Sequence, residues 1–185
     1  MFLSARLAHL AVAALLAAPC SAWAHSADRF EATILAVHNA ERAQVGSPPL
    51  TWDPALAAGA APWAQYLAST GQFVHSDRKS RPGIKENLWK GPRGVHDVGS
   101  MVHLWVSEKQ YFVPGIFPAN SRTGNWLDVS HYTQLIWPTT QRVGCALSSG
   151  RGSDFLVCRY SPAGNIDGRP VPAPPAPVTG TERGR

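Results

Sequence analysis

The chain has 185 residues, with 17 basic and 12 acidic side chains and a formal net charge of +5. This length suits one domain of ordinary size. Without residues 1–24 and 169–185 the net charge is +2, because these two segments contain four arginines and one glutamate. They are Arg6, Arg169, Arg183, Arg185 and Glu182. A nucleic-acid-binding domain is normally much more basic, so the composition excludes nucleic acid as the expected partner.

The N-terminal segment has the pattern of a secretory signal peptide over residues 1–24. After a positive charge comes an apolar run at residues 10–18, and Ala22-Trp23-Ala24 resembles a cleavage site. The run is too short to span a membrane, and no other segment approaches the necessary length. Cys20 allows a lipoprotein alternative, but the proline before it suits lipoprotein processing poorly. We therefore expect a secreted or periplasmic protein whose mature chain begins at His25.

Two helices are predicted next along the chain. Apolar residues between Phe30 and Val37 recur at helical spacing, which predicts a helix from Asp28 to Val45. Asp53-Pro54 is typical of a helix start, since aspartate caps the first turn and proline fits its first position. That second helix is predicted to end at Gly71, because glycine is the usual residue after a helix C-terminus.

A third helix is predicted to begin near Asp97. Val98, Met101 and Trp105 form its inward stripe, and Glu108 continues the same stripe. A carboxylate on an apolar face is costly unless it finds polar partners. The position of Glu108 therefore indicates a polar site.

Three further segments each place one ionisable residue among apolar or aromatic neighbours. FVHS contains His75, KENLW contains Glu86, and SHYTQLIWPTT contains His131. A single histidine beside apolar residues is usually a satisfied core residue, but two histidines and two carboxylates, with Glu108, could form one compact polar site. The segment around His131 is short and fits either a helix or a strand.

A β-hairpin is predicted after His131. Arg142–Leu147 and Phe155–Tyr160 read as its two strands, with the turn at Ser149-Gly150. Helices first and at least three strands, mostly late in the chain, predict an α+β protein built as an α-β-α sandwich. Cys145 and Cys158 flank the turn and predict a disulfide in an oxidising compartment, with two unrelated buried thiols as the alternative.

The C-terminal segment, residues 169–185, is rich in proline and nearly free of bulky apolar side chains. This composition predicts an extended, disordered tail. The folded domain is therefore expected to cover residues 25–168.

Four segments, in this order, resemble the CAP superfamily, which includes cysteine-rich secretory proteins, insect venom allergens and plant pathogenesis-related proteins. HNAER at 38–42 and PLTWDPAL at 49–56 are similar to the family's opening. SHYTQLIWPTT at 130–140 resembles one family signature, with Ser130 where glycine or a charged residue is usual, and FLVCRYSPAGNI at 155–166 resembles a second. The resemblance covers nearly all of the expected mature chain and implies the same α-β-α sandwich.

The resemblance also implies a site, because His75, Glu86, Glu108 and His131 match the family's cleft tetrad. In that family the two histidines can hold a divalent cation, commonly zinc, with the acids close by. A carboxylate that accepts the second ring N–H fixes an imidazole, and two protein ligands leave positions open. His75 and His131 are thus the expected zinc ligands, and a metal-free hydrogen-bonded network is the alternative.

The sequence favours binding over catalysis, since it has no HExxH helix, nucleophile elbow or phosphate-binding loop. Ser76 and Ser130 stand beside the two histidines and leave a metal-assisted or serine-type hydrolase as one alternative. A secreted effector that acts through its surface, with an inert tetrad, is another.

The segment between Glu108 and His131 is aromatic and either packs onto the core or lines an apolar groove. Several CAP relatives bind sterols or fatty acids through this part of the fold, so the resemblance makes such a small apolar ligand a candidate partner. The candidate groove residues are Tyr111, Phe112, Phe117 and Trp126.

A basic cluster surrounds His75 and Glu86 in the sequence. It is interpreted as a solvated loop face that could also steer anionic ligands toward the site. Its members are Arg78, Lys79, Arg81, Lys85, Lys90 and Arg93.

Overall fold

The computed structural model describes residues 20–172, with side chains from residue 28 onward. Most of the expected signal peptide, and the tail beyond Pro172, lie outside the described residues. No helix within this range is long and apolar enough to cross a bilayer. The helices are α1 (Cys20–Gln44), α2 (Pro54–Thr70), α3 (Val98–Val106) and α4 (Ser130–Ile136), with short 3-10 helices η1 (Arg78–Ser80), η2 (Ser107–Tyr111) and η3 (Trp126–Val129).

The main sheet has four strands in the order β1-β4-β5-β2. β1 runs parallel to β4, whereas β5 is antiparallel to both of its neighbours, β4 and β2. A separate two-stranded sheet pairs β3 with β6. The strands are β1 (Thr51–Trp52), β2 (Lys85–Pro92), β3 (Gly115–Ile116), β4 (Arg142–Gly150), β5 (Ser153–Ser161) and β6 (Pro170–Val171).

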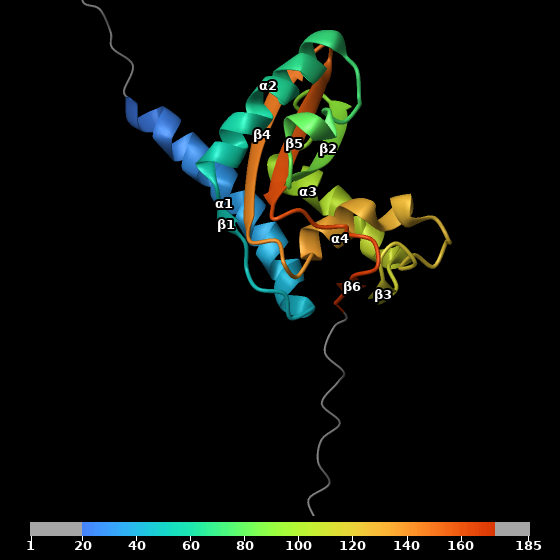
Figure 1. Cartoon of the computed structure of the whole chain (residues 1–185). Coiled ribbons are helices and arrows are strands. Elements are labelled where there is room, and N and C mark those ends of the chain that lie inside the picture. The colour runs from blue at the N-terminus through green and yellow to red at the C-terminus, as the bar shows by residue number, and fades with distance from the viewer. Residues whose placement is uncertain (1–19, 173–185) are drawn as a thin grey trace, which may run out of the picture.

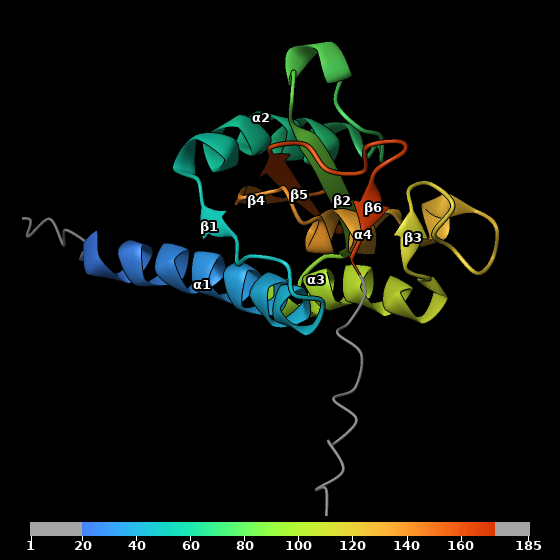
Figure 2. The same cartoon turned by 60° about the horizontal axis from the view of Figure 1, so that its bottom comes forward.

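Helices cover both faces of the main sheet, with α2 on one side and α1 and α3 on the other (Figures 1 and 2). Alternate residues of β5 enter the two layers, since Phe155 and Val157 pack with α2 while Leu156 and Cys158 pack with α1, α3 and α4. Burial on both faces explains why β5 reads as a continuous apolar run rather than an alternating one. The predicted α+β class and α-β-α sandwich are confirmed.

Local signals place both ends of α2 and the start of α3 as predicted, whereas α1 begins at Cys20, eight residues before the predicted start at Asp28. The Asp53 carboxylate accepts hydrogen bonds from the first N–H groups of α2, and Gly71 closes that helix in the left-handed region at φ 76°. Asp97 likewise caps α3. The α-helix stops at Val106, however, so Glu108 lies in the 3-10 turn that follows it.

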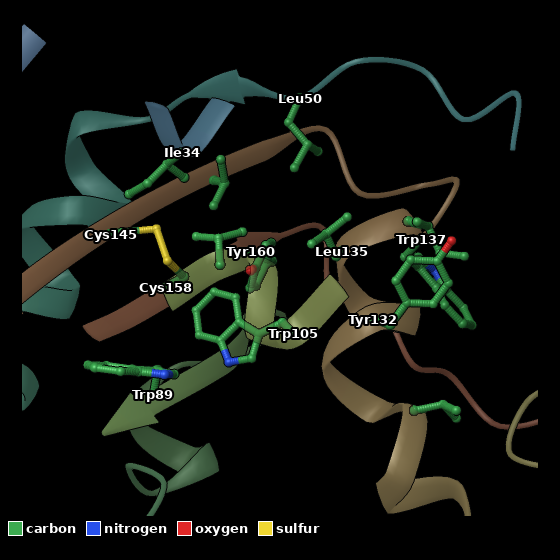
Figure 3. Close-up of a cluster of buried hydrophobic side chains, with 14 of the residues drawn as sticks. Ile34, Leu50, Trp89, Trp105, Tyr132, Leu135, Trp137, Cys145, Cys158 and Tyr160 are labelled. Carbon is green, nitrogen blue, oxygen red and sulfur yellow. A yellow bond between two sulfur atoms is a disulfide. The ribbon is translucent and has the colours of Figure 1, made fainter. Parts of the chain in front are cut away.

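The predicted hairpin forms, but its turn lies two residues later than expected. Gly150 pairs with Ser153, and the loop residues Arg151 and Gly152 both adopt positive φ, at 50° and 76°. Such a two-residue turn matches the twist of antiparallel strands, so the ladder continues to its edge. The disulfide joins Cys145 to Cys158 across directly paired positions of β4 and β5, inside the core (Figure 3).

The predicted end of the folded domain after Gly168 is wrong, because the chain continues into β6. Val171 is only 3% exposed and belongs to the main hydrophobic core. The Phe117 N–H donates to the Arg169 carbonyl over 2.9 Å, so β6 is tied to the segment containing β3. A proline-rich composition did not reveal this pairing, since one buried valine and a few main-chain bonds suffice for it.

Truncated chains can test whether the folded domain ends at Gly168 or includes β6. A chain ending at Gly168 should be less stable than one ending at Pro172, because it loses the burial of Val171, about 1.5–3 kcal/mol. For a chain of this size that corresponds to a fall in melting temperature of roughly 3–12 °C. Thermal unfolding followed by circular dichroism measures the difference, and equal melting temperatures would show that β6 contributes nothing to stability.

Candidate functional site

Three of the four predicted site residues line one pocket of about 490 Å³. His75 lies in the loop after α2, Glu86 in β2, and His131 in the first turn of α4. Glu108, in η2, is not among the lining residues and is instead hydrogen-bonded to His131. The structure thus arranges the four residues as two histidine–carboxylate pairs.

The first pair joins His75 to Glu86. The His75 Nδ1 and Glu86 Oε1 atoms are 3.0 Å apart, and the same carboxylate accepts the Ser76 backbone N–H and hydroxyl over 3.0 and 2.8 Å. The carboxylate is fully buried, and Arg81 and Arg159 form ion pairs with it. Burial acts to raise the pKa of Glu86, but these hydrogen bonds and the Arg81 charge outweigh it and lower that pKa below its ordinary value. Glu86 is therefore an anion that holds the Nδ1 edge of the His75 ring.

The second pair joins His131 to Glu108. The Glu108 Oε1 atom lies 2.5 Å from His131 Nδ1, while Oε2 accepts the backbone N–H groups of His131 and Tyr132 over 2.9 and 3.0 Å. Free N–H groups at the start of a helix require such acceptors. The Trp105 ring stacks on the His131 ring with centroids 5.9 Å apart. Glu108 therefore has the polar partners that its position among apolar residues in the sequence predicted.

Both imidazoles are held in the same way. With a carboxylate as acceptor at Nδ1, a neutral imidazole carries its proton there, and Nε2 keeps a lone pair. Neither Nε2 atom is hydrogen-bonded to another described residue, so both remain available as ligand atoms. Among the residues described, no group of three or more His, Cys, Asp or Glu side chains is arranged to hold a metal ion. A cation held by His75 and His131 would thus have two protein ligands and open positions for water or a ligand.

A profile of the cysteine-rich secretory protein family matches residues 35–160 of this chain. The chain belongs to this family. Pathogenesis-related protein 1C of Nicotiana tabacum is 36% identical over 136 residues, which cover 73% of this chain and 76% of the relative. GLIPR1-like protein 1 of Bos taurus is 31% identical over 156 residues, covering 75% of this chain and 61% of that protein. The resemblance seen in the sequence to the CAP superfamily is confirmed.

Solved structures share the fold. The crystal structure of Na-ASP-1 is 27% identical and matches with a TM-score of 0.63 over 78% of this chain, which spans only 41% of that longer protein. The crystal structure of NaASP2 with Zn²⁺ is 22% identical and matches with a TM-score of 0.67 over 80% of this chain and 86% of that one. These matches confirm the CAP fold.

A buried polar network of this CAP protein supports the site from within the core. The Asn87 side-chain amide donates to the His131 carbonyl over 3.1 Å and to the Tyr160 hydroxyl over 3.3 Å. The Tyr160 hydroxyl donates to His38 Nε2 over 2.9 Å, and His38 Nδ1 donates to the Ile34 carbonyl over 2.8 Å. Burial lowers the pKa of His38 to about 4, so this histidine is neutral and structural. Asn87 is a site residue that the sequence did not single out, although it directly follows Glu86.

The aromatic residues predicted to form a groove do not act as one unit. Phe112 is a core residue, packed against the Tyr132 ring with centroids 5.4 Å apart, while Tyr111 is exposed. Phe117 and Trp126 contact each other and line the pocket that contains the two histidines. The predicted groove is therefore corrected to a single apolar wall of that pocket.

The two serines beside the histidines have other partners. The Ser76 hydroxyl donates to Glu86, and the Ser130 hydroxyl donates to the Leu127 carbonyl over 3.1 Å. In a Ser–His–Glu arrangement the serine hydroxyl contacts an imidazole nitrogen, which neither of these hydroxyls does in the described structure. This geometry does not favour the serine-type hydrolase alternative.

Proposed function

We propose that this CAP protein binds a small ligand or a partner in the pocket lined by His75, Glu86 and His131, and that the two imidazoles hold a zinc ion there. The observation that carries the proposal is the pairing of each Nδ1 atom with a carboxylate, at 3.0 and 2.5 Å, on two histidines of one pocket. This pairing orients imidazoles in many zinc sites and raises their basicity as ligands. When bound, zinc would supply open coordination positions to oxygen or nitrogen atoms of the ligand.

Zinc is the first cation to test because the NaASP2 structure, which has the same fold, was determined with Zn²⁺. The apolar wall of the pocket, with Phe117, Trp126 and Leu127, supports a ligand that is partly apolar, such as a sterol or a fatty acid. We also propose that the chain is exported, on the basis of its family and of the N-terminal pattern at residues 1–24.

A purely structural tetrad is the second candidate. Glu86 and Glu108 together accept hydrogen bonds from the backbone N–H groups of Ser76, His131 and Tyr132. The Glu108 bonds connect η2 to α4, and the Glu86 bond connects β2 to the loop after α2. Both connections would be needed even without a ligand. In that case the surface of the protein would carry its function, and the tetrad would only stabilise the fold.

Calorimetric titration with zinc at pH 7.5 distinguishes the two candidates. The parent chain should bind zinc, and Glu108→Gln should weaken binding by roughly 10–100-fold, because the amide no longer supports His131 as the carboxylate does. Glu41→Gln is a matched control, since Glu41 pairs with Lys109 and does not line the pocket. A flat titration of the parent, with zinc in the high micromolar range, would leave only the structural tetrad.

A further inference from the structure

Three basic side chains line the same pocket as the two histidines. Arg78 comes from η1, Arg81 follows η1, and Lys85 begins β2. The other members of the basic cluster predicted from the sequence, Lys79, Lys90 and Arg93, are not among the lining residues. The fold has therefore brought half of that cluster to the pocket wall.

The Arg81 guanidinium already has hydrogen-bond and ion-pair partners within the protein. It donates to the Ser76 hydroxyl over 2.9 Å and to the Ile84 carbonyl over 2.8 Å, and it forms an ion pair with Glu86 at 4.0 Å. Arg81 therefore positions the Ser76–Glu86 part of the site and balances the buried carboxylate.

Lys85 and Arg78 are different, because neither side chain makes a hydrogen bond or an ion pair with any described residue. The Lys85 side chain is half-buried, so its ammonium loses part of its hydration without a partner in return. Burial lowers the pKa of Lys85, and the Arg78 and Arg81 charges lower it further, against an opposing effect of Asp167. Two unpaired cations on one wall create a local potential that favours an anion.

The remaining acidic groups do not cancel this potential. Glu86 already accepts hydrogen bonds from His75, Ser76 and Arg159. Asp167 is the other acidic lining residue. Against these two carboxylates stand three cationic lining side chains, so the wall keeps a net positive charge with both histidines neutral.

We propose that Arg78 and Lys85 form an oxyanion subsite of this pocket, which takes a phosphate or carboxylate group of the bound ligand. The apolar part of that ligand then lies against Trp126 and Leu127, which line the same pocket and are partly exposed. The inference rests on the proposed function, because it names the chemistry of the ligand that the pocket accepts. A sterol without an acidic group would leave both cations unpaired. An amphipathic anion would pair with Arg78 and Lys85 and also contact the apolar lining residues.

NMR titration of the metal-free chain tests the subsite independently of zinc. The ¹⁵N-labelled protein, treated with EDTA, is titrated with inorganic phosphate and, separately, with acetate at constant ionic strength. Saturable shifts of the amides near Arg78 and Lys85 are expected, and tighter binding of phosphate or of acetate identifies which oxyanion the subsite prefers. Absence of saturable shifts with both probes would overturn the proposal, while leaving the zinc titration to be judged by itself.

Matched variants show whether the two cations carry the binding. Lys85→Gln and Arg78→Gln should each weaken binding roughly tenfold or more, as expected for the loss of a charge-assisted hydrogen bond. Lys79→Gln removes the same charge next to Arg78 but outside the pocket, and should change affinity less than about twofold. Equal losses in all three variants would reveal general charge attraction and contradict a defined subsite. Arg78 is exposed, so its variant stays informative if Lys85→Gln alters the fold.

Discussion

Alanine at His75 or at His131 is expected to abolish zinc binding by the parent chain. The described residues provide no third ligand near these imidazoles, so the loss of one leaves a single ligand, which is too few for a stable zinc site. Calorimetric titration of each variant at pH 7.5 should therefore be flat. His103→Ala is the control, because His103 is exposed on α3 and does not line this pocket.

The zinc affinity of the parent should also fall as the pH is lowered. Protons and zinc compete for the same imidazole nitrogens, so zinc binding should weaken progressively as acid protonates them. A double variant with alanine at both histidines that still bound zinc would place the ion elsewhere and contradict the proposed site. If the parent bound no zinc while the alanine variants melted at lower temperature, the tetrad would be structural.

Arg42→Met is expected to destabilise the fold by about 3–5 kcal/mol, because four carbonyls each lose a hydrogen bond worth about 1 kcal/mol. The Arg42 side chain is completely buried at the end of α1. Its guanidinium donates to the carbonyls of Pro48, Leu135, Trp137 and Thr140 over distances of 2.6 to 3.0 Å. Burial lowers the pKa of Arg42 to about 10, which still leaves the side chain charged at neutral pH.

Methionine fills a similar volume but donates no hydrogen bond, so four carbonyls, three of them in buried hydrogen bonds, would lose their partner. The melting temperature should fall by roughly 6–20 °C for a chain of this size. Urea unfolding measures the free energy of unfolding. The stability of Arg42→Lys should lie between those of the unmodified protein and Arg42→Met, because an ammonium cannot reproduce the planar arrangement of guanidinium donors. Arg29→Met, at an exposed position of the same helix, should change stability by less than about 0.5 kcal/mol. A similar small change for Arg42→Met would show that water replaces the guanidinium.

Much of the fold could be predicted because its signals are local. The caps Asp53 and Asp97 and the helix stop at Gly71 each act within a few residues, through side-chain bonds to the first N–H groups or through a positive φ. The paired cysteines and the two long family-like segments added the disulfide and the α-β-α sandwich. The turn at Arg151-Gly152 was missed because Ser149-Gly150 has equally suitable residues, and only the pairing of β4 with β5 selects the register.

The candidate site was predictable in its members but not in its arrangement. Glu108 on an apolar stripe indicated that a carboxylate had buried partners, which are the His131 ring and the first N–H groups of α4. The pairing of His75 with Glu86, and the absence of Glu108 from the pocket wall, follow from how β2 and η2 pack. The aromatic loop likewise did not reveal that both Phe112 and Phe117 are buried in the core and that only Phe117 also lines the pocket.

The sequence by itself determined both ends of α2, the start of α3, the cysteine pair and the family, and it named the four residues of the tetrad. Only the tertiary structure decided that Arg42 is buried, that Val171 belongs to the core, and that Arg78 and Lys85 line the pocket without partners of their own. The physical reason is the range of the interactions. Capping and turn preferences are satisfied between neighbours in the chain, whereas the cost of burying a charge depends on partners such as Leu135 and Trp137, which lie 93 and 95 residues away from Arg42.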